Sequence, residues 1–258
     1  MLTHQPKPPL NLSLERHQIE IQRNKSAWER KPVLRQIYAS FYERIARLID
    51  RSIAGRILEI GSGIGNLKSQ LPDALSSDVF FNPWLDVVSD AYEIPFAGGT
   101  ISHLVLFDVF HHLEAPKCFL KEARRVLNAR GRLILFEPYI SGCSFPVYQW
   151  VHPEPVAWRA EINLTESLPR PRNYYAAQGN ATRVFFRREC PPLLDGWTIL
   201  HGEALASFSY LLSGGFSKPC FYPRGCLHWL QRLDQVLSNW PKVFGARCLV
   251  ALTPTGAK

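Results

Sequence analysis

The sequence lacks any long apolar run, because none approaches the roughly 20 residues that a membrane-spanning helix needs. The proline-rich stretch 1–9 lacks the charged-then-apolar layout of a secretory signal. The six cysteines form no C-x-x-C pair, which argues against a disulfide framework and against zinc ligation by cysteine. We therefore expect a cytoplasmic protein with reduced thiols, no transmembrane segment and no metal site.

The chain also lacks a dense run of charge of one sign. Its 30 Lys and Arg residues exceed its 22 Asp and Glu residues, giving a net charge of +8, but they are spread as pairs such as Arg124-Arg125 and Arg187-Arg188. No internal repeat, RNA-binding appendage or Asn/Asp-Pro-Pro-Tyr/Phe motif is present. Solvated surfaces account for most of these charges, and phosphate-bearing partners (nucleic acid, phospholipid or sugar phosphate) stay open as alternatives.

The length and composition of the chain suit one α/β core, since 258 residues with 46% hydrophobic content can bury a sizeable interior. Helical spacing of apolar residues marks residues 10–52, and short apolar runs alternate with helical patterns over residues 55–138. Beyond residue 139 an irregular insert precedes a strand near 197–200, a helix near 226–237 and a strand near 247–252. We expect an N-terminal tail and helical cap (1–54) and a main domain (55–258) with a substrate insert at about 139–195.

A glycine-rich turn is the most informative stretch. The apolar run at residues 57–60 predicts a buried strand, and glycines follow at positions 61, 63 and 65. A chain that turns sharply there lets backbone pass close to a ligand where a side chain would collide. Residues 66–71 look helical, and a helix N-terminus favours an anionic group. The alternative is a tight turn with a purely structural role.

The spacing G-x-G-x-G after Glu59 differs from the dinucleotide-binding pattern, because position 66 is Asn. It resembles motif I of the class I S-adenosylmethionine (SAM) methyltransferases. Further segments similar to this family, with a type 11-like domain, follow in order: Asp78, then residues 87–96, 104–113 and 122–138. The resemblance covers residues 55–138 well.

The resemblance implies a doubly wound, Rossmann-like sheet of seven strands. The sheet would be mostly parallel with an antiparallel C-terminal hairpin, plus N-terminal helices and an irregular insert after strand five. It implies SAM as the cofactor, with Asp78 accepting both ribose hydroxyls and Asp90-Ala91 beside the adenine. The implied cofactor-binding residues are Glu59, Gly61, Ser62, Gly63, Gly65, Asp78, Asp90, Ala91, Phe107 and Asp108.

The sequence departs from the family pattern between strands two and three. Residues 79–86 leave little room for the usual crossover helix, and Pro83 argues against a helix there. We expect a short aromatic crossover in its place, which alters the wall of the adenosine pocket.

Catalytic candidates follow the carboxyl ends of the strands, where open α/β sheets place ligands. His112 is the first choice for acid–base work because imidazole titrates near neutrality, and His111 and Tyr139 are further candidates. The alternative for the double histidine is to cap the next helix beneath the site. Aromatic residues of the insert, such as Trp150 and Trp158, either cover an acceptor or pack the insert.

The sequence thus predicts a SAM-dependent methyltransferase that acts on an O, N or C atom of a small-molecule, lipid-linked or saccharide acceptor. The alternatives are an RNA or protein methyltransferase and a non-catalytic SAM-binding module. Peripheral membrane contact and the oligomeric state are left open.

Overall fold

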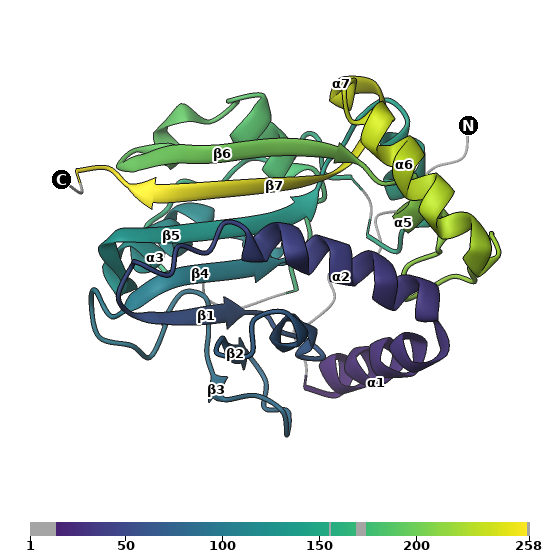
Figure 1. The fold of residues 1–258 in the computed structure, drawn as a ribbon. Coiled ribbons are helices and arrows are strands. Elements are labelled where there is room, and N and C mark those ends of the chain that lie inside the picture. The colour runs from purple at the N-terminus through teal and green to yellow at the C-terminus, as the bar shows by residue number, and fades with distance from the viewer. Residues whose placement is uncertain (1–13, 155, 169–173, 257–258) are drawn as a thin grey trace.

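A computed structural model describes residues 14–154, 156–168 and 174–256. Seven strands form one sheet in the order β3-β2-β1-β4-β5-β7-β6 (Figure 1). The strands are β1 Arg56–Ile60, β2 Leu75–Asp78, β3 Val87–Val88, β4 Ile101–Phe107, β5 Leu127–Pro138, β6 Trp197–Ala206 and β7 Gly245–Pro254. Strands β1 to β5 pair in parallel, while β7 is antiparallel to both β5 and β6. The predicted fold class is confirmed.

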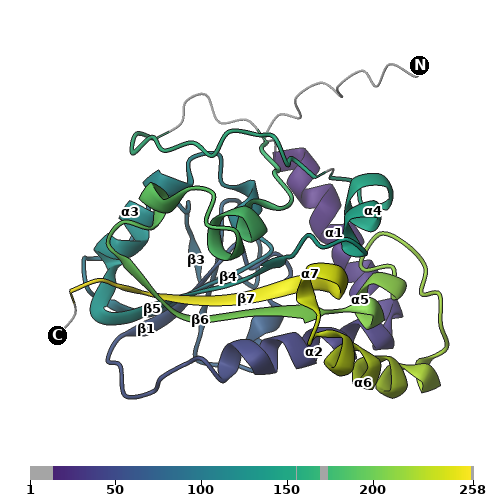
Figure 2. The same cartoon turned by 90° about the horizontal axis from the view of Figure 1, so that it is seen from above.

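Helices cover both faces of the sheet, with α3 on one face and α2 and α6 on the other (Figure 2). The helices are α1 Leu14–Arg30, α2 Pro32–Ala46, α3 Pro116–Val126, α4 Ser144–Pro146, α5 Phe208–Leu212, α6 Leu227–Leu237 and α7 Pro241–Phe244. The expected N-terminal helical zone is divided in two because Pro32 starts a new helix at its first turn. Residues 10–13 of that expectation lie outside the described residues.

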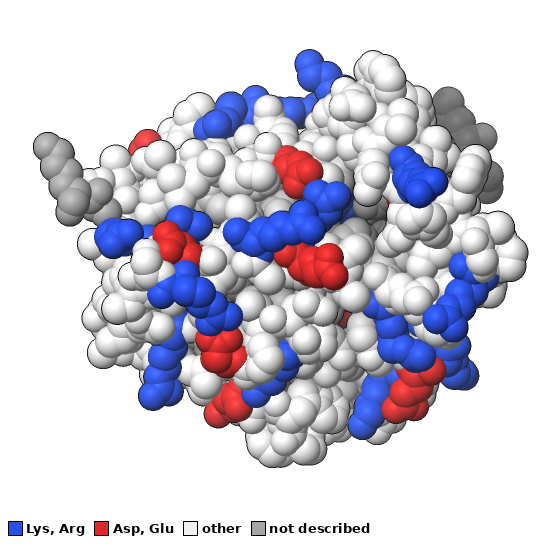
Figure 3. Space-filling view, viewed as in Figure 1, with Lys and Arg blue, Asp and Glu red and all other residues white. Residues whose placement is uncertain are grey.

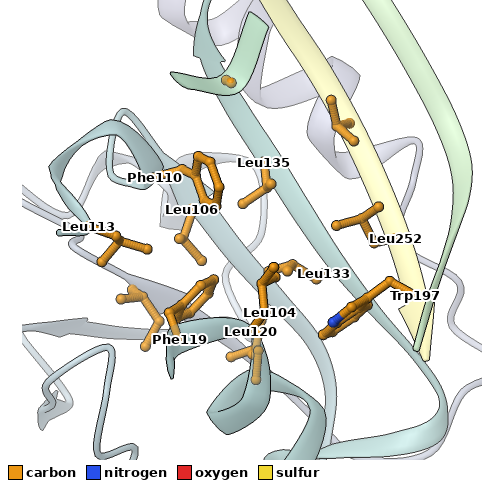
Figure 4. Packing of buried hydrophobic residues seen from close by; sticks show 14 of the residues in the cluster. Leu104, Leu106, Phe110, Leu113, Phe119, Leu120, Leu133, Leu135, Trp197 and Leu252 are labelled. Atoms are coloured by element: carbon orange, nitrogen blue, oxygen red, sulfur yellow. The ribbon is translucent and has the colours of Figure 1, made fainter. Parts of the chain in front are cut away.

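Strand β4 occupies the centre of the sheet, and all but its last residue are buried. Such a strand reads as a continuous apolar run because helices cover both of its faces. On one face Leu104 and Leu106 meet Phe119 and Leu120 of α3 (Figure 4). Burying each of these side chains contributes about 1.5–3 kcal/mol, so this contact holds α3 against the sheet.

An aromatic cluster fills the other face, between α2 and the sheet. The rings of Phe41, Phe107 and Phe136 lie with centroids 4.7 to 6.3 Å apart. Tyr38 of α2 stacks on Phe107 at 5.2 Å. The N-terminal helical segment therefore packs into the same core as the sheet.

The segment between β1 and β2 contains less helix than the sequence predicts. The helix expected at residues 66–71 is wrong, since the chain forms only a four-residue 3-10 turn, Asn66–Ser69. A turn of that length carries little macrodipole, so anion binding by a helix N-terminus is not available here. Within residues 79–86, all of which the structure describes, no helix forms, as predicted.

None of the helices in the described part of the chain is both long enough and apolar enough to span a bilayer.

Candidate functional site

The glycine turn after β1 has the backbone that its sequence predicts. Gly61, Gly63 and Gly65 have φ of 71°, 53° and 73°, a region that side chains strongly disfavour. A β-carbon at Gly65 would come within 2.9 Å of Trp84, whereas at Gly63 the nearest atom, from Ile21, lies 3.9 Å away. The space beside the turn therefore opens at Gly63.

Side chains of β2 tie this turn to the sheet. The Gly63 N–H donates to Asp78 Oδ2 at 2.9 Å, and the Val79 N–H donates to Asp78 Oδ1 at 2.7 Å. Each carboxylate oxygen has a second lone pair, so Asp78 can still accept two hydroxyl groups. Burial raises the pKa of Asp78, and His17 of α1, 4.0 Å away, opposes that rise. Ser62 also bonds to β2, through its N–H to the Ser77 carbonyl at 2.8 Å.

Glu59 in β1 is buried beneath the same turn, with 4% of its surface exposed. Its Oε2 has no hydrogen-bond partner among the described residues. Burial raises the pKa of Glu59 to about 7, against the opposing effect of the Ser62 hydroxyl. A buried carboxylate oxygen without a partner is costly, so this position suits a cationic or hydrogen-bonding ligand.

Trp84 is a site residue that sequence reasoning did not single out. Its indole N–H donates to the Gly63 carbonyl at 2.9 Å, and its ring lies against Gly65. The unusual aromatic crossover at residues 79–86 was the available signal. The indole therefore packs beside the glycine turn, and its hydrogen bond helps to hold the backbone of the turn.

Among the other predicted cofactor-binding residues, Asp90 and Ala91 lie in a turn, whereas Phe107 lies in the aromatic cluster. Asp90 accepts the Tyr92 N–H at 2.9 Å, which holds the turn that contains Ala91. The Phe107 ring stacks 4.9 Å from Phe136, inside the aromatic cluster. Phe107 therefore packs largely within the core at the tip of β4.

Asp108 follows β4 with a φ of 57°, unusual for a residue other than glycine. Its Oδ1 accepts a hydrogen bond from Arg247 Nη2 at 2.6 Å. Arg247 lies in β7, is 2% exposed, and its guanidinium is 4.8 Å from the centre of the Phe136 ring. Sequence reasoning missed this partner because 139 residues separate the pair. One oxygen of Asp108 is therefore already paired within the protein.

His111 is held between two carboxylates. Its Nδ1 lies 2.6 Å from Glu137 Oε2, and its Nε2 lies 3.6 Å from Glu154 Oε2. Glu137 is fully buried at the end of β5 and also accepts the N–H groups of Val109 and Phe110. Burial by itself would lower the pKa of His111, but the two carboxylates raise it to about 10.

His112 lies beside His111, with ring centroids 4.1 Å apart. Its Nδ1–H donates to the Tyr175 carbonyl at 2.9 Å, which leaves Nε2 as the unprotonated nitrogen, 3.9 Å from Glu154 Oε1. Burial and the neighbouring His111 lower the pKa of His112 to about 4. Glu154 was not predicted, because it comes from the insert.

Tyr139, the third catalytic candidate, packs against residues of the insert and of β7. Its ring packs edge-on against Phe186 at 5.1 Å and lies against Gly245 at the start of β7. It is 7% exposed, so its surroundings are those of a packed ring at the end of β5.

Comparisons with known proteins agree with this geometry. Residues 81–135 match the model of a methyltransferase domain family. A SAM-dependent methyltransferase from Thermotoga maritima shares 14% identity with a TM-score of 0.52, covering 92% of this chain and 99% of that chain. A SAM-dependent methyltransferase from Archaeoglobus fulgidus shares 13% identity with a TM-score of 0.51, covering 86% of this chain and 94% of that chain. Comparison with curated proteins gives no match.

SAM fits the residues present, since the open side of Gly63, the spare lone pairs of Asp78 and the unpaired oxygen of Glu59 lie at one edge of the sheet. Residues 81–135 thus resemble a methyltransferase domain, and the fold of the chain is shared with SAM-dependent methyltransferases.

Proposed function

We propose that this protein transfers a methyl group from SAM to an O, N or C atom of a small-molecule, lipid-linked or saccharide acceptor. The observation that carries the proposal is the placement of the glycine turn next to the two histidines. Strands β1 and β4 are hydrogen-bonded neighbours, with Ile60 in register with Leu106, so both sites follow the same sheet edge.

Helix α1 links the two sites. Ile21 is the nearest neighbour of the open side of Gly63. Earlier in α1, the Arg16 guanidinium lies 3.6 Å from the centre of the Tyr174 ring, and that ring lies 5.4 Å from the His112 ring. A single helix therefore lies along the cofactor turn and the histidines, as the wall of a shared reaction site would.

Bound SAM supplies a methyl group on a positively charged sulfur. To bind SAM, the chain offers the backbone of the glycine turn, the Asp78 carboxylate for the ribose hydroxyls, and the buried carboxylate of Glu59. Alignment of the acceptor and exclusion of water are then the main contributions of the protein.

The insert provides a surface for the acceptor. A hollow of about 510 Å³ is lined in part by Phe145, Trp150, Trp158 and Arg159. Ring faces and a guanidinium group suit an apolar or glycosylated molecule that carries an anionic group. This support favours a small or lipid-linked acceptor.

One layer of hydrogen-bonded residues lies between the hollow and the histidines. The Ala157 N–H, in the hollow's wall, donates to the Gln178 carbonyl at 3.1 Å. The Gln178 side chain in turn donates to Glu154 Oε2 at 3.0 Å. We assign to His111 and His112 the positioning of the acceptor, because their Nε2 atoms face Glu154 on the side of the hollow.

No charged surface favours RNA or protein as the acceptor on the face shown in Figure 3. Basic and acidic side chains are interspersed on that face. Ion pairs such as Arg44–Glu203 neutralise part of the basic charge. A steep loss of acceptor affinity with rising salt would instead support a nucleic-acid substrate.

The first test is SAM binding by calorimetry. Gly63→Val is expected to weaken binding at least about 100-fold, or roughly 2.7 kcal/mol, because a branched side chain closes the open side of the turn. Gly99→Val is the matched control, since Gly99 has a φ of 74° and no described atom within 4 Å of its added β-carbon. Equal SAM affinity in both variants would contradict the assignment of the turn.

The acceptor is identified by mass spectrometry of a metabolite extract incubated with the protein and deuteromethyl-SAM. A product heavier by one labelled methyl group is expected. Tight SAM binding with no methylated product in small-molecule, lipid, RNA or protein fractions would support the non-catalytic alternative.

A further inference from the structure

Three potential metal ligands converge where β4 ends and the insert returns to the sheet. The nearest nitrogen–oxygen distances are 3.6 Å for His111 Nε2 to Glu154 Oε2 and 3.9 Å for His112 Nε2 to Glu154 Oε1. One ligand atom from each of the three residues lies within 4.8 Å of the other two. With metal–ligand bonds of about 2.1 Å, a tetrahedral ion separates its ligand atoms by about 3.4 Å. Small shifts of side chains would bring the three atoms to that spacing.

Both imidazole rings are oriented as metal ligands usually are. The Nδ1 of His111 is paired with the Glu137 carboxylate at 2.6 Å, and the Nδ1 of His112 with the Tyr175 carbonyl at 2.9 Å. Metal-ligating histidines almost always place their second ring nitrogen against a carboxylate or a backbone carbonyl, which fixes the tautomer. In both rings Nε2 is therefore the atom directed toward Glu154.

The surroundings also hold surplus negative charge and an unsatisfied polar atom. Glu137 and Glu154 flank the histidines, while Arg247 is already paired with Asp108. Gln178, which binds Glu154, is 1% exposed, and its Oε1 has no hydrogen-bond partner among the described residues. A cation bound to neutral imidazoles would balance the two carboxylates in place of the proton that His111 otherwise carries.

We infer that His111, His112 and Glu154 bind one divalent transition-metal ion of the Zn²⁺ class at the acceptor end of the site. Two imidazole nitrogens with one carboxylate oxygen are a ligand set for zinc and related ions that leaves a coordination position open. The inference deepens the proposed function and rests on it for the role of the ion, which is to hold and polarise the acceptor atom. The sequence does not predict this site, because its cysteines lack metal spacing and Glu154 is distant from the two histidines along the chain.

The test measures metal binding directly. The full-length protein, stripped with a chelator, is titrated with Zn²⁺ by calorimetry and with Co²⁺ by visible absorption. One ion per chain is expected, with Co²⁺ bands typical of a four- or five-coordinate site. His112→Ala and Glu154→Gln are expected to lower Zn²⁺ affinity by at least about 10-fold, since each removes one of three ligands.

His201→Ala is the matched control, because His201 also lies near a carboxylate, with Nε2 3.7 Å from Glu203 Oε2. It should bind Zn²⁺ as the parent does. Thermal unfolding of each variant shows whether the fold is kept, and Glu154→Gln preserves the shape of the side chain if His112→Ala is unstable. Absence of stoichiometric binding, or equal Zn²⁺ affinity in Glu154→Gln and the parent, would overturn the inference.

Failure of this inference is distinguishable from failure of the proposed function. His112→Ala should lose Zn²⁺ and keep SAM, whereas Gly63→Val should lose SAM and keep Zn²⁺. SAM binding with no Zn²⁺ binding rejects the metal site alone. Zn²⁺ binding without SAM binding in the parent rejects the proposed function and leaves the metal site.

Discussion

The glycine turn and the histidine cluster lie on one edge of the sheet but are built over very different sequence distances. In the turn, Gly63 is 15 residues from Asp78 and 21 from Trp84. In the cluster, His112 reaches Tyr175 across 63 residues, and Asp108 reaches Arg247 across 139. A local site leaves its pattern in the sequence, whereas a site assembled from distant segments does not.

The two regions also differ in whether their buried carboxylates have partners. Glu59 under the glycine turn keeps an oxygen without a partner in the described part of the chain, while Asp108 in the other region is paired with a buried arginine. An unpaired buried polar group lowers the stability of the fold, so its presence is consistent with a ligand-binding site. A paired charge instead contributes to holding distant segments together.

The largest expected effect comes from breaking the long-range region at Arg247. Arg247→Met keeps most of the side-chain volume among the aromatic rings but leaves the Asp108 carboxylate without its partner. We expect a loss of about 3 kcal/mol in the free energy of unfolding, the lower end for a buried pair because Asp108 is 28% exposed. Urea denaturation measures it.

The double variant Asp108→Asn/Arg247→Met is the control. Asn tolerates the positive φ at position 108 and removes the stranded charge, so part of the lost stability should return. If the double variant is as unstable as Arg247→Met, then lost packing rather than the ion pair explains the effect.

Glu59→Gln tests the unpaired carboxylate in the local region. The pKa of Glu59 rises to about 7 in the folded state, from 4.5, so the folded protein binds more protons between these values. Stability of the ligand-free protein should therefore fall as pH rises from 4.5 to 7. Above pH 7, Glu59→Gln should be more stable than the parent by up to about 3 kcal/mol, measured by denaturation at several pH values.

The same variant should bind SAM more weakly, because it lacks the negative charge. Increased stability above pH 7 together with reduced SAM affinity would identify Glu59 as a functional group kept at a cost. A parent protein whose stability does not change between pH 4.5 and 7 would contradict the raised pKa.

The smallest effect is expected at Trp84. Trp84→Phe removes the indole N–H that donates to the Gly63 carbonyl and keeps an aromatic ring beside Gly65. Loss of one such hydrogen bond amounts to about 1 kcal/mol, or about 5-fold in SAM affinity. Calorimetry measures this change, and Trp229→Phe, at an exposed position in α6, is the control. Equal SAM affinity in Trp84→Phe and the parent would show that the turn does not need this donor.

Much of the fold could be predicted from the sequence. Apolar runs marked β1, β4 and β5, and the absence of a crossover helix followed from Pro83. The helix expected after the glycine turn was wrong, because tertiary packing replaced it with a short turn at Asn66–Ser69. Propensity over six residues is a weak predictor where the neighbouring chain decides the available length.

The candidate site divides in the same way. The family resemblance implied that Gly63 and Asp78 belong to one site, and the two residues are hydrogen-bonded across 15 positions of the chain. Arg247 and Glu154 could not, since neither a buried arginine nor an insert carboxylate has a sequence pattern that names its partner.

The sequence by itself determined strands β1, β4 and β5 and the backbone of the glycine turn, because these depend on periodicity and on residues that permit a positive φ. The arrangement of the sheet and the role of Asp78 were implied by the family resemblance. Only the tertiary structure decided which charges meet: Asp108 with Arg247, and Glu154 with both histidines. The physical reason is that a buried charge is costly unless it is paired. Which residue becomes its partner depends on how the insert and β7 pack against the sheet edge.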